Sequence, residues 1–158
     1  MDSERFINTY LRNYRLDDES GVSVYENIRR NNNFTDEEIY DILSLPLIWN
    51  IEEDGYVHIL FESGGAYVEK DYLTEDISTG FKLLGAIYTY YNKDLTEELA
   101  REIARSDIYD FYYDGIIRQM TEGARKLRDL DTIGPELNNI SYNEIHKGYL
   151  LRISFRIN

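Results

Sequence analysis

The sequence predicts a mostly α-helical bundle, folded as one domain, with a short C-terminal β-strand over residues 149–157. Three observations predict this fold class. Apolar residues recur at helical spacing along most of the chain, polar residues stand at positions typical of helix N-caps, and the C-terminus changes to strict alternation of apolar and polar residues. The chain of 158 residues has the length of one domain and shows no internal repeat or linker, so we expect residues 1–158 to form a single domain.

The first third of the chain predicts three helices. A serine N-cap followed by apolar residues at helical spacing predicts a helix over residues 3–14, and a shorter helix is expected over residues 22–30. Thr35 and Glu38 form a T-x-x-E capping box, which predicts that a third helix begins directly after Thr35. Pro46 is expected to end that helix, because proline cannot donate the next backbone hydrogen bond.

The middle of the chain is less uniform. Residues 56–61, with the sequence Tyr-Val-His-Ile-Leu-Phe, are so short and so continuously apolar that the pattern leaves helix and strand open. A helix is predicted within residues 77–91, where apolar residues share one helical face. Asp94 and Glu97 are spaced as a further capping pair, which predicts another helix after them.

The last third predicts two helices and then the strand. Ser106 or Asp107 is placed to cap a long helix that reaches Leu127, and a short helix is expected over residues 136–147. The alternation at residues 149–157 is typical of a half-buried strand, which needs a partner. The sequence leaves three partners open: residues 56–61, the same strand of a second subunit in a homodimer, and a strand of a binding partner.

Acidic residues are concentrated in one part of the chain. The formal charge is −13, and residues 31–80 hold twelve acids against the single base Lys70. A field of this sign opposes direct binding to nucleic acid or to an anionic membrane and attracts a basic protein surface. The chain has no cysteine, no apolar run long enough to span a membrane and no signal-peptide pattern at its N-terminus, so we expect a cytoplasmic protein.

The acids of this segment fall into two groups. Asp36, Glu37 and Glu38 are explained by the first turn of the predicted third helix, where carboxylates complement the helix dipole. Helix capping does not explain the acids that follow Trp49, the first of which are expected near a helix C-terminus, where the dipole disfavours them. This second group is our candidate partner-binding set: Glu52, Glu53, Asp54, Glu62, Glu69, Asp71, Glu75 and Asp76.

Catalytic and metal-binding patterns are not evident. His58 and His146 share no metal-ligand spacing, and the chain lacks a phosphate-binding loop and a serine nucleophile elbow. His58 lies in an apolar run, which is more typical of a buried, hydrogen-bonded histidine than of a general base. We therefore expect a protein that is not an enzyme and needs neither metal nor cofactor, with a hydrolase acting through paired carboxylates as the alternative from another class.

Residues 47–67 and 80–86 resemble a family of small acidic bacterial helical proteins that includes a DNA-mimic protein. The matching positions are Glu53, Gly55, Phe61 and the pair Gly85-Ala86. The resemblance implies an all-α bundle in which residues 56–61 are helical, and a protein that occupies a DNA-binding surface on another protein. Independently, carboxylates at i, i+3 and i+4 of a helix lie about 5–6 Å apart and can present negative charge in rows, as duplex DNA does.

The leading hypothesis is therefore an acidic, DNA-mimic-like inhibitory protein that covers a basic, nucleic-acid-binding surface of another protein. Two variants share the same charge pattern. One is an immunity protein that neutralises a basic nuclease toxin, and the other is a phage-encoded inhibitor of a host defence nuclease. Binding of either kind is expected to weaken steeply with salt, because the attraction is between charges.

Overall fold

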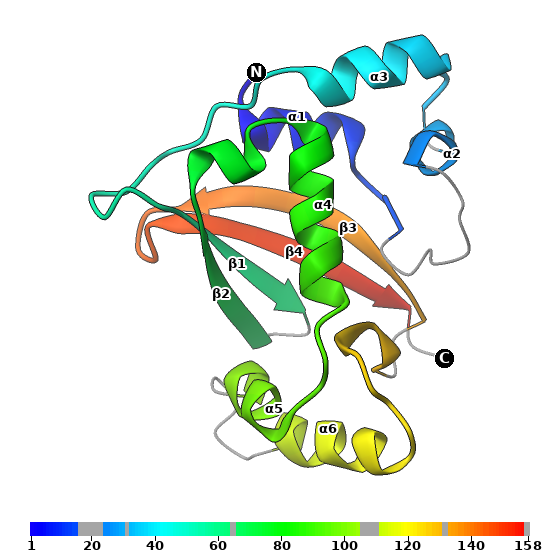
Figure 1. Ribbon diagram of the computed structural model, residues 1–158, viewed down its shortest axis with the longest axis vertical. Helices are drawn as coiled ribbons and strands as arrows, with labels where there is room; N and C mark the ends of the chain where they lie inside the picture. Colours follow the sequence, from blue (N-terminus) through cyan, green and yellow to red (C-terminus); the bar gives the residue numbers. More distant parts are fainter. Residues whose placement is uncertain (16–23, 31, 64–65, 105–110, 131–132, 157–158) are drawn as a thin grey trace.

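The computed structural model describes residues 1–15, 24–30, 32–63, 66–104, 111–130 and 133–156 (Figure 1). Its α-helices are α1 Ser3–Tyr10, α2 Val24–Arg29, α3 Asp36–Ser44, α4 Gly80–Tyr91, α5 Glu97–Ile103 and α6 Phe111–Thr121. Within the described residues there are also two short 3₁₀ helices, η1 Thr74–Ile77 and η3 Leu127–Asp129, and four strands, β1 Val57–Ser63, β2 Ala66–Tyr72, β3 Ile133–Asn143 and β4 Gly148–Arg156. Within these ranges, every helix is too short or too polar to cross a membrane.

The strands form one mixed four-stranded sheet in the order β2-β1-β4-β3. The two central strands, β1 and β4, run parallel, and each has an antiparallel neighbour, β2 and β3 respectively (Figure 1). The predicted mostly α-helical bundle is therefore wrong, and the fold is a mixed α/β fold. The pattern of residues 56–61 left helix and strand open, because a central strand such as β1 can be buried on both faces and then lacks the alternation of a half-buried strand.

The structure decides the partner of the C-terminal strand. β4 confirms the strand predicted for residues 149–157 over its described part, and it pairs with β1, for example Ile59 opposite Tyr149 and Phe61 opposite Leu151. Residues 57–61 are therefore strand, and the helix that the family resemblance implied for residues 56–61 is wrong.

The helix predicted over residues 136–147 is also wrong, because most of this segment belongs to β3. The pairing of β3 with β4 shifts register twice, between the pairs of Ile133 and Glu136 and between those of Leu137 and Asn139. Each shift breaks the alternation of side chains between the two faces, which hides the strand from a period-two search.

One face of the sheet packs against helices. α4 crosses in front of the sheet in Figure 1, and its Tyr90 ring stacks on Phe61 of β1 with centroids 4.1 Å apart. α4 begins at Gly80, where an added Cβ would lie 2.6 Å from Cζ of Phe6, so the glycine allows α1 and α4 to approach closely. Phe6 and Ile59 are almost completely buried in the resulting core.

The outer edge of β3 is closed by the N-terminal segment. The side chain of Asn8 donates to the carbonyl of Ile140 and accepts from its N–H, each at 2.9 Å. The backbone after α1 continues the pairing, with Asn13 N–H donating to Leu137 O and Leu137 N–H donating to Tyr14 O. These bonds occupy strand groups that would otherwise offer an edge to another chain.

The helix boundaries agree in part with the predicted caps. The capping box of Thr35 and Glu38 at α3 is confirmed, whereas α1 is capped by Asp2 and ends at Tyr10. α5 is capped by Thr96 and not by Asp94, whose carboxylate lies 3.2 Å from the ammonium group of Lys126.

The long helix expected to reach Leu127 is wrong at its end, because α6 stops at Thr121 and Leu127 opens η3. Its predicted caps, Ser106 and Asp107, lie outside the described residues.

Candidate functional site

The turn before β1 carries the first three acids of the predicted set. Gly55 N–H donates to Glu52 O at 2.9 Å and Glu52 N–H donates to Tyr56 O at 3.0 Å, so the backbone reverses between these residues. Gly55 has φ +86°, a conformation that glycine adopts at little cost. The expectation that Glu52, Glu53 and Asp54 lie near a helix C-terminus is wrong, because they occupy a turn that leads into a strand.

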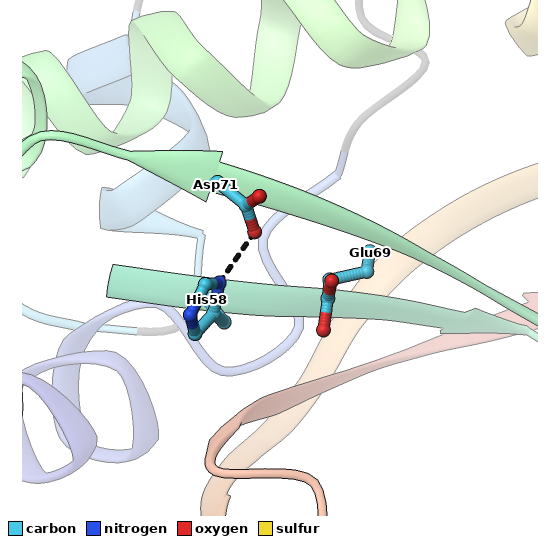
Figure 2. Close-up of side chains that lie close together, drawn as sticks. All are labelled: His58, Glu69 and Asp71. Atoms are coloured by element: carbon cyan, nitrogen blue, oxygen red, sulfur yellow. Dashed lines mark hydrogen bonds and ion pairs between the residues drawn. The ribbon is translucent and has the colours of Figure 1, made fainter. Parts of the chain in front are cut away.

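Strand pairing brings three further residues of this region together. His58 of β1 lies directly opposite Asp71 of β2, and Leu60 lies opposite Glu69. Paired residues of antiparallel strands project to the same face, and residues two apart on a strand share that face. His58, Glu69 and Asp71 therefore stand together on the face opposite to Phe61 and the helices (Figure 2).

His58 links the turn to the hairpin. Its Nδ1 lies 2.5 Å from a carboxylate oxygen of Asp71, the contact drawn in Figure 2, and its Nε2 lies 2.9 Å from a carboxylate oxygen of Asp54. Only 13% of the His58 side chain is exposed. The ring is thus held between a carboxylate of the turn and a carboxylate of β2, with Glu69 as a third acid nearby.

These carboxylates change the protonation of the ring. Burial lowers the pKa of His58, but the hydrogen bond to Asp71 and the charges of Asp71, Asp54 and Glu69 outweigh it, so the pKa lies above its usual value. With a carboxylate on each nitrogen, the ring is best satisfied as an imidazolium that donates twice. Such a ring has no nitrogen left to take a proton from a substrate, which argues against a general base.

The same cluster offers donor atoms for a metal ion. One ligand atom each from His58, Glu69 and Asp71 lie within 4.8 Å of one another. Imidazole and carboxylates are ligands of Zn²⁺ and similar cations, and they bind in their deprotonated forms. A metal would therefore have to displace the proton that His58 shares with Asp71. The three residues are of types that can bind a cation, but the contacts they make are those of an ion-paired cluster.

Two other acids of the predicted set also have partners inside the protein. The hydroxyl of Tyr142 on β3 donates to a carboxylate oxygen of Glu52, and this hydrogen bond raises the pKa of Tyr142 to about 12. Glu62 lies 3.1 Å from Nε of Arg152 on β4. Glu52 joins the turn before β1 to β3, and Glu62 joins β1 to β4, so a structural role already accounts for both.

The remaining acids of the set are free to meet a partner. Within the described part of the chain, four side chains of the set make no hydrogen bond and no ion pair: Glu53, Glu69, Glu75 and Asp76. All four are exposed. Lys70, the single base of residues 31–80, is directed to Glu102 of α5 at 3.8 Å and does not neutralise them.

Most acids of the candidate partner-binding set lie at one end of the sheet. The turn before β1, the end of β2 and η1 lie at the left of Figure 1, and Trp49 Nε1 donates to Ile77 O at 2.8 Å, which joins the segment before the turn to η1. We call this region the acidic corner and define it by its carboxylates: Glu52, Glu53, Asp54, Asp71, Glu75 and Asp76. Glu69 and Glu62 lie farther along the strands, on the same face as His58.

A second acidic surface lies away from the corner. An open depression of about 450 Å³ is lined by Tyr25 of α2 and by Asp36, Glu37, Tyr40 and Asp41 of α3. Asp36 pairs with Arg29, and Glu37 belongs to the first turn of α3. The helix itself therefore explains much of this charge, as the sequence predicted.

Sequence reasoning missed the role of His58. We predicted a buried, hydrogen-bonded histidine, and the hydrogen bonds are present, but their partners are two acids, Asp54 and Asp71, that the sequence suggested only one by one. Had residues 56–61 been assigned to a strand, the spacing of Glu69 and Asp71 in a facing strand would have indicated the cluster.

Comparisons of the chain with protein-family models, with curated proteins and with solved structures find no match. No family, activity or partner can therefore be carried over from a relative. The functional interpretation rests on the geometry of the acidic corner and its surroundings.

Proposed function

We propose that this chain is an acidic inhibitory binding protein that covers a basic, nucleic-acid-binding surface of another protein. The observation that carries the proposal is the set of exposed acids at the corner. Glu53, Glu75 and Asp76 have no side-chain partner in the described residues, although the net charge of −13 makes unpaired acids costly. A basic partner supplies the missing counter-charge.

The local balance of charge supports this choice of partner. Lys82 borders the corner, with its ammonium group donating to the backbone carbonyl of Glu75 at 2.9 Å, and Lys147 lies in the turn between β3 and β4 beside the acidic turn. Together with His58 they are outnumbered by the six carboxylates of the corner. The field of the corner is therefore negative, which attracts Lys and Arg and repels nucleic acid and anionic membrane.

The arrangement of the acids differs from the helical rows that the sequence suggested. Glu69 and Asp71 are two residues apart on a strand, which separates them by about 6.6 Å along it. The acids of the corner come from a turn, a strand end and a 3₁₀ helix. The proposal therefore depends on the density of negative charge at one end of the sheet and requires no helical copy of the DNA backbone.

Two specific forms of the proposal differ only in the partner. An immunity protein would bind one cognate nuclease toxin, and a phage-encoded inhibitor would bind a host defence nuclease. Both act in the cytoplasm, where we place this protein. The alternative from another class, a carboxylate-dependent hydrolase, would have to use carboxylates as both acid and base, because both nitrogens of His58 already contact carboxylates.

The test uses two variants with the same change of charge. The corner variant carries Glu53→Gln, Glu75→Gln and Asp76→Asn. The α3 variant carries Glu37→Gln, Glu38→Gln and Asp41→Asn, and it keeps the capping box because glutamine can replace glutamate there. Wild-type protein and both variants are immobilised and exposed to an extract of the cells that encode the chain.

We expect wild-type protein and the α3 variant to retain the same basic, nucleic-acid-binding protein, and the corner variant to retain much less of it. Added duplex DNA or RNA should release the retained protein, because the partner's nucleic-acid-binding surface is the one that is covered. Equal retention by all three proteins, or retention that nucleic acid does not affect, would contradict the proposal.

A further inference from the structure

Large apolar side chains are exposed around the acidic corner. Ile145, at the tip of the turn between β3 and β4, is 91% exposed. Ile51 and Tyr56, on either side of the acidic turn, are 54% and 41% exposed, and Leu73, directly after β2, is 42% exposed. Single exposed apolar residues need no explanation, but several at one end of the molecule indicate a contact surface.

Contacts within the protein bring the segments that carry these four residues to the same end of the sheet. The hydroxyl of Tyr142 reaches Glu52, so the start of the β3–β4 turn lies against the acidic turn. An added Cβ on Gly148, at the other end of the β3–β4 turn, would lie 3.0 Å from Cβ of His58. Figure 1 shows the β3–β4 turn beside the acidic turn at the same end of the sheet.

Tyr56 and Leu73 are neighbours for a different reason. Val57 pairs with Tyr72 at the end of the β1–β2 ladder, so the next residues outward on the two strands are Tyr56 and Leu73. Tyr56 directly precedes β1 and Leu73 directly follows β2. Acids of the corner lie within four residues of each of them in the sequence. The apolar residues therefore stand among the carboxylates.

Ile145 is held in its exposed position by its own turn. The carboxamide oxygen of Asn143 accepts hydrogen bonds from the N–H groups of Ile145 and His146, each at 3.0 Å. Lys147 closes the turn with φ +51°. The chain thus presents an isoleucine to solvent from an ordered turn, where a polar residue would satisfy the backbone equally well.

We infer that the acidic corner, together with Ile51, Tyr56, Leu73 and Ile145, is a docking surface for a folded protein whose contact patch has an apolar centre bordered by Lys and Arg. This inference rests on the proposed function and specifies the surface of the partner. Stable protein interfaces combine an apolar centre with a polar rim, and complementary charge selects the partner and its orientation. A second copy of this chain is a poor occupant, because its corner carries the same negative charge.

The mixed surface has a measurable consequence for recognition. Salt screens the attraction between charges, whereas burial of apolar side chains is not screened. If the surface of this chain attracted ligands by charge alone, it would prefer ligands made only of basic residues. If its apolar side chains are also buried on binding, its ligands should carry aliphatic or aromatic residues beside the basic ones.

The inference can be tested without knowing the partner, with a library of random linear peptides displayed on phage. The library is selected on wild-type protein at moderate salt, and the affinity of the enriched peptides is then measured for two variants. Ile145→Ser removes the most exposed apolar side chain of the surface. Ile48→Ser is the matched control, because Ile48 is 65% exposed and lies beside the N-terminus, where its N–H donates to Met1 O.

We expect enriched peptides that combine Lys or Arg with aliphatic or aromatic residues. Their affinity should fall about tenfold or more with Ile145→Ser and should change less than about twofold with Ile48→Ser. Circular dichroism checks that both variants fold, which their exposed positions favour.

Other outcomes distinguish a failure of the inference about the mixed surface from a failure of the proposed function. Peptides that are basic without apolar residues, or binding that Ile145→Ser leaves unchanged, would overturn the inference and leave the proposed function standing. A selection without basic peptides would overturn both. Sedimentation of the chain alone should show a monomer, and a dimer that Ile145→Ser dissociates would assign this surface to a second copy instead.

Discussion

The start of α3 and the acidic turn before β1 each carry three consecutive acids, but the protein supports them differently. Asp36, Glu37 and Glu38 occupy the first turn of a helix that is capped by Thr35, and their neighbours in the chain explain them. Glu52, Glu53 and Asp54 occupy a turn whose partners come from elsewhere, since Tyr142 is 90 residues from Glu52 in sequence. Three consecutive acids can thus be a local feature of a helix or a product of the tertiary fold.

The comparison separates charge that stabilises structure from charge that is available for binding. At α3, the acids complement the helix dipole and one of them pairs with Arg29. At the corner, Glu52 and Asp54 join the turn to the sheet, while Glu53 remains exposed without a partner in the described residues. The following substitutions are chosen to disturb one region and spare the other.

The largest effect is expected from Gly148→Ala, which crowds the corner from β4. The added Cβ would lie 2.8 Å from Cδ1 of Leu60 and 3.0 Å from the carbonyl oxygen of His58. We expect the free energy of unfolding, measured with urea, to fall by about 1–3 kcal/mol, because the strands must shift to admit the methyl group. Gly85→Ala is the control, since its Cβ meets nothing within 4 Å on α4, and it should stabilise the protein by about 0.5–1 kcal/mol.

His58→Gln should destabilise the corner in a pH-dependent way. The folded-state pKa of His58 is raised, so its extra stabilisation is fully present below the unfolded value of about 6.5 and is lost as pH rises through the folded value. We expect the substitution to cost about 1–2 kcal/mol near pH 6. The difference from wild type should shrink towards pH 9, and a difference that grows with pH would contradict the ion-paired cluster.

Thr35→Ala should destabilise α3 and leave the corner intact. The substitution removes the side chain that accepts from Glu38 N–H, and the loss of such a cap costs about 1 kcal/mol. Unlike the effect of His58→Gln, this cost should be the same near pH 6 and pH 9. Thermal unfolding at the two pH values distinguishes the two substitutions.

The smallest effect is expected from Tyr142→Phe, which removes the hydrogen bond to Glu52. Glu52 is half-buried and the contact is partly open to solvent, so the free energy of unfolding should fall less than with any of the destabilising substitutions above. Glu52→Gln together with Tyr142→Phe completes a double-mutant cycle, and the interaction energy from urea unfolding should account for most of the single effect. Additive effects would show that the contact does not stabilise the protein.

The same contrast explains what the sequence could and could not predict. The N-terminus of α3 was predictable, because Thr35 and Glu38 are three residues apart and their capping box depends on nothing else. The acidic turn was predicted as exposed charge near a helix end, and its true setting requires Asp71 of β2 and Tyr142 of β3.

The sheet was hidden for related reasons. β4 alternates and was predicted, whereas β1 is apolar without a period and β3 contains two register shifts. The exposure of Ile145 could not be predicted from local sequence, because whether an isoleucine is exposed depends on the tertiary fold. Local patterns therefore gave helix ends and one strand, while the candidate site depends on pairings between distant segments.

The most direct test of the central claim is the affinity of the purified partner for wild-type protein and for the two charge variants, measured by titration calorimetry at several salt concentrations. We predict that the corner variant, with Glu53, Glu75 and Asp76 neutralised, binds about 10- to 100-fold more weakly and with a shallower salt dependence. The α3 variant, with the same change in net charge, should stay within about twofold of wild type. Equal losses for the two variants would show that net charge, and not the acidic corner, determines binding.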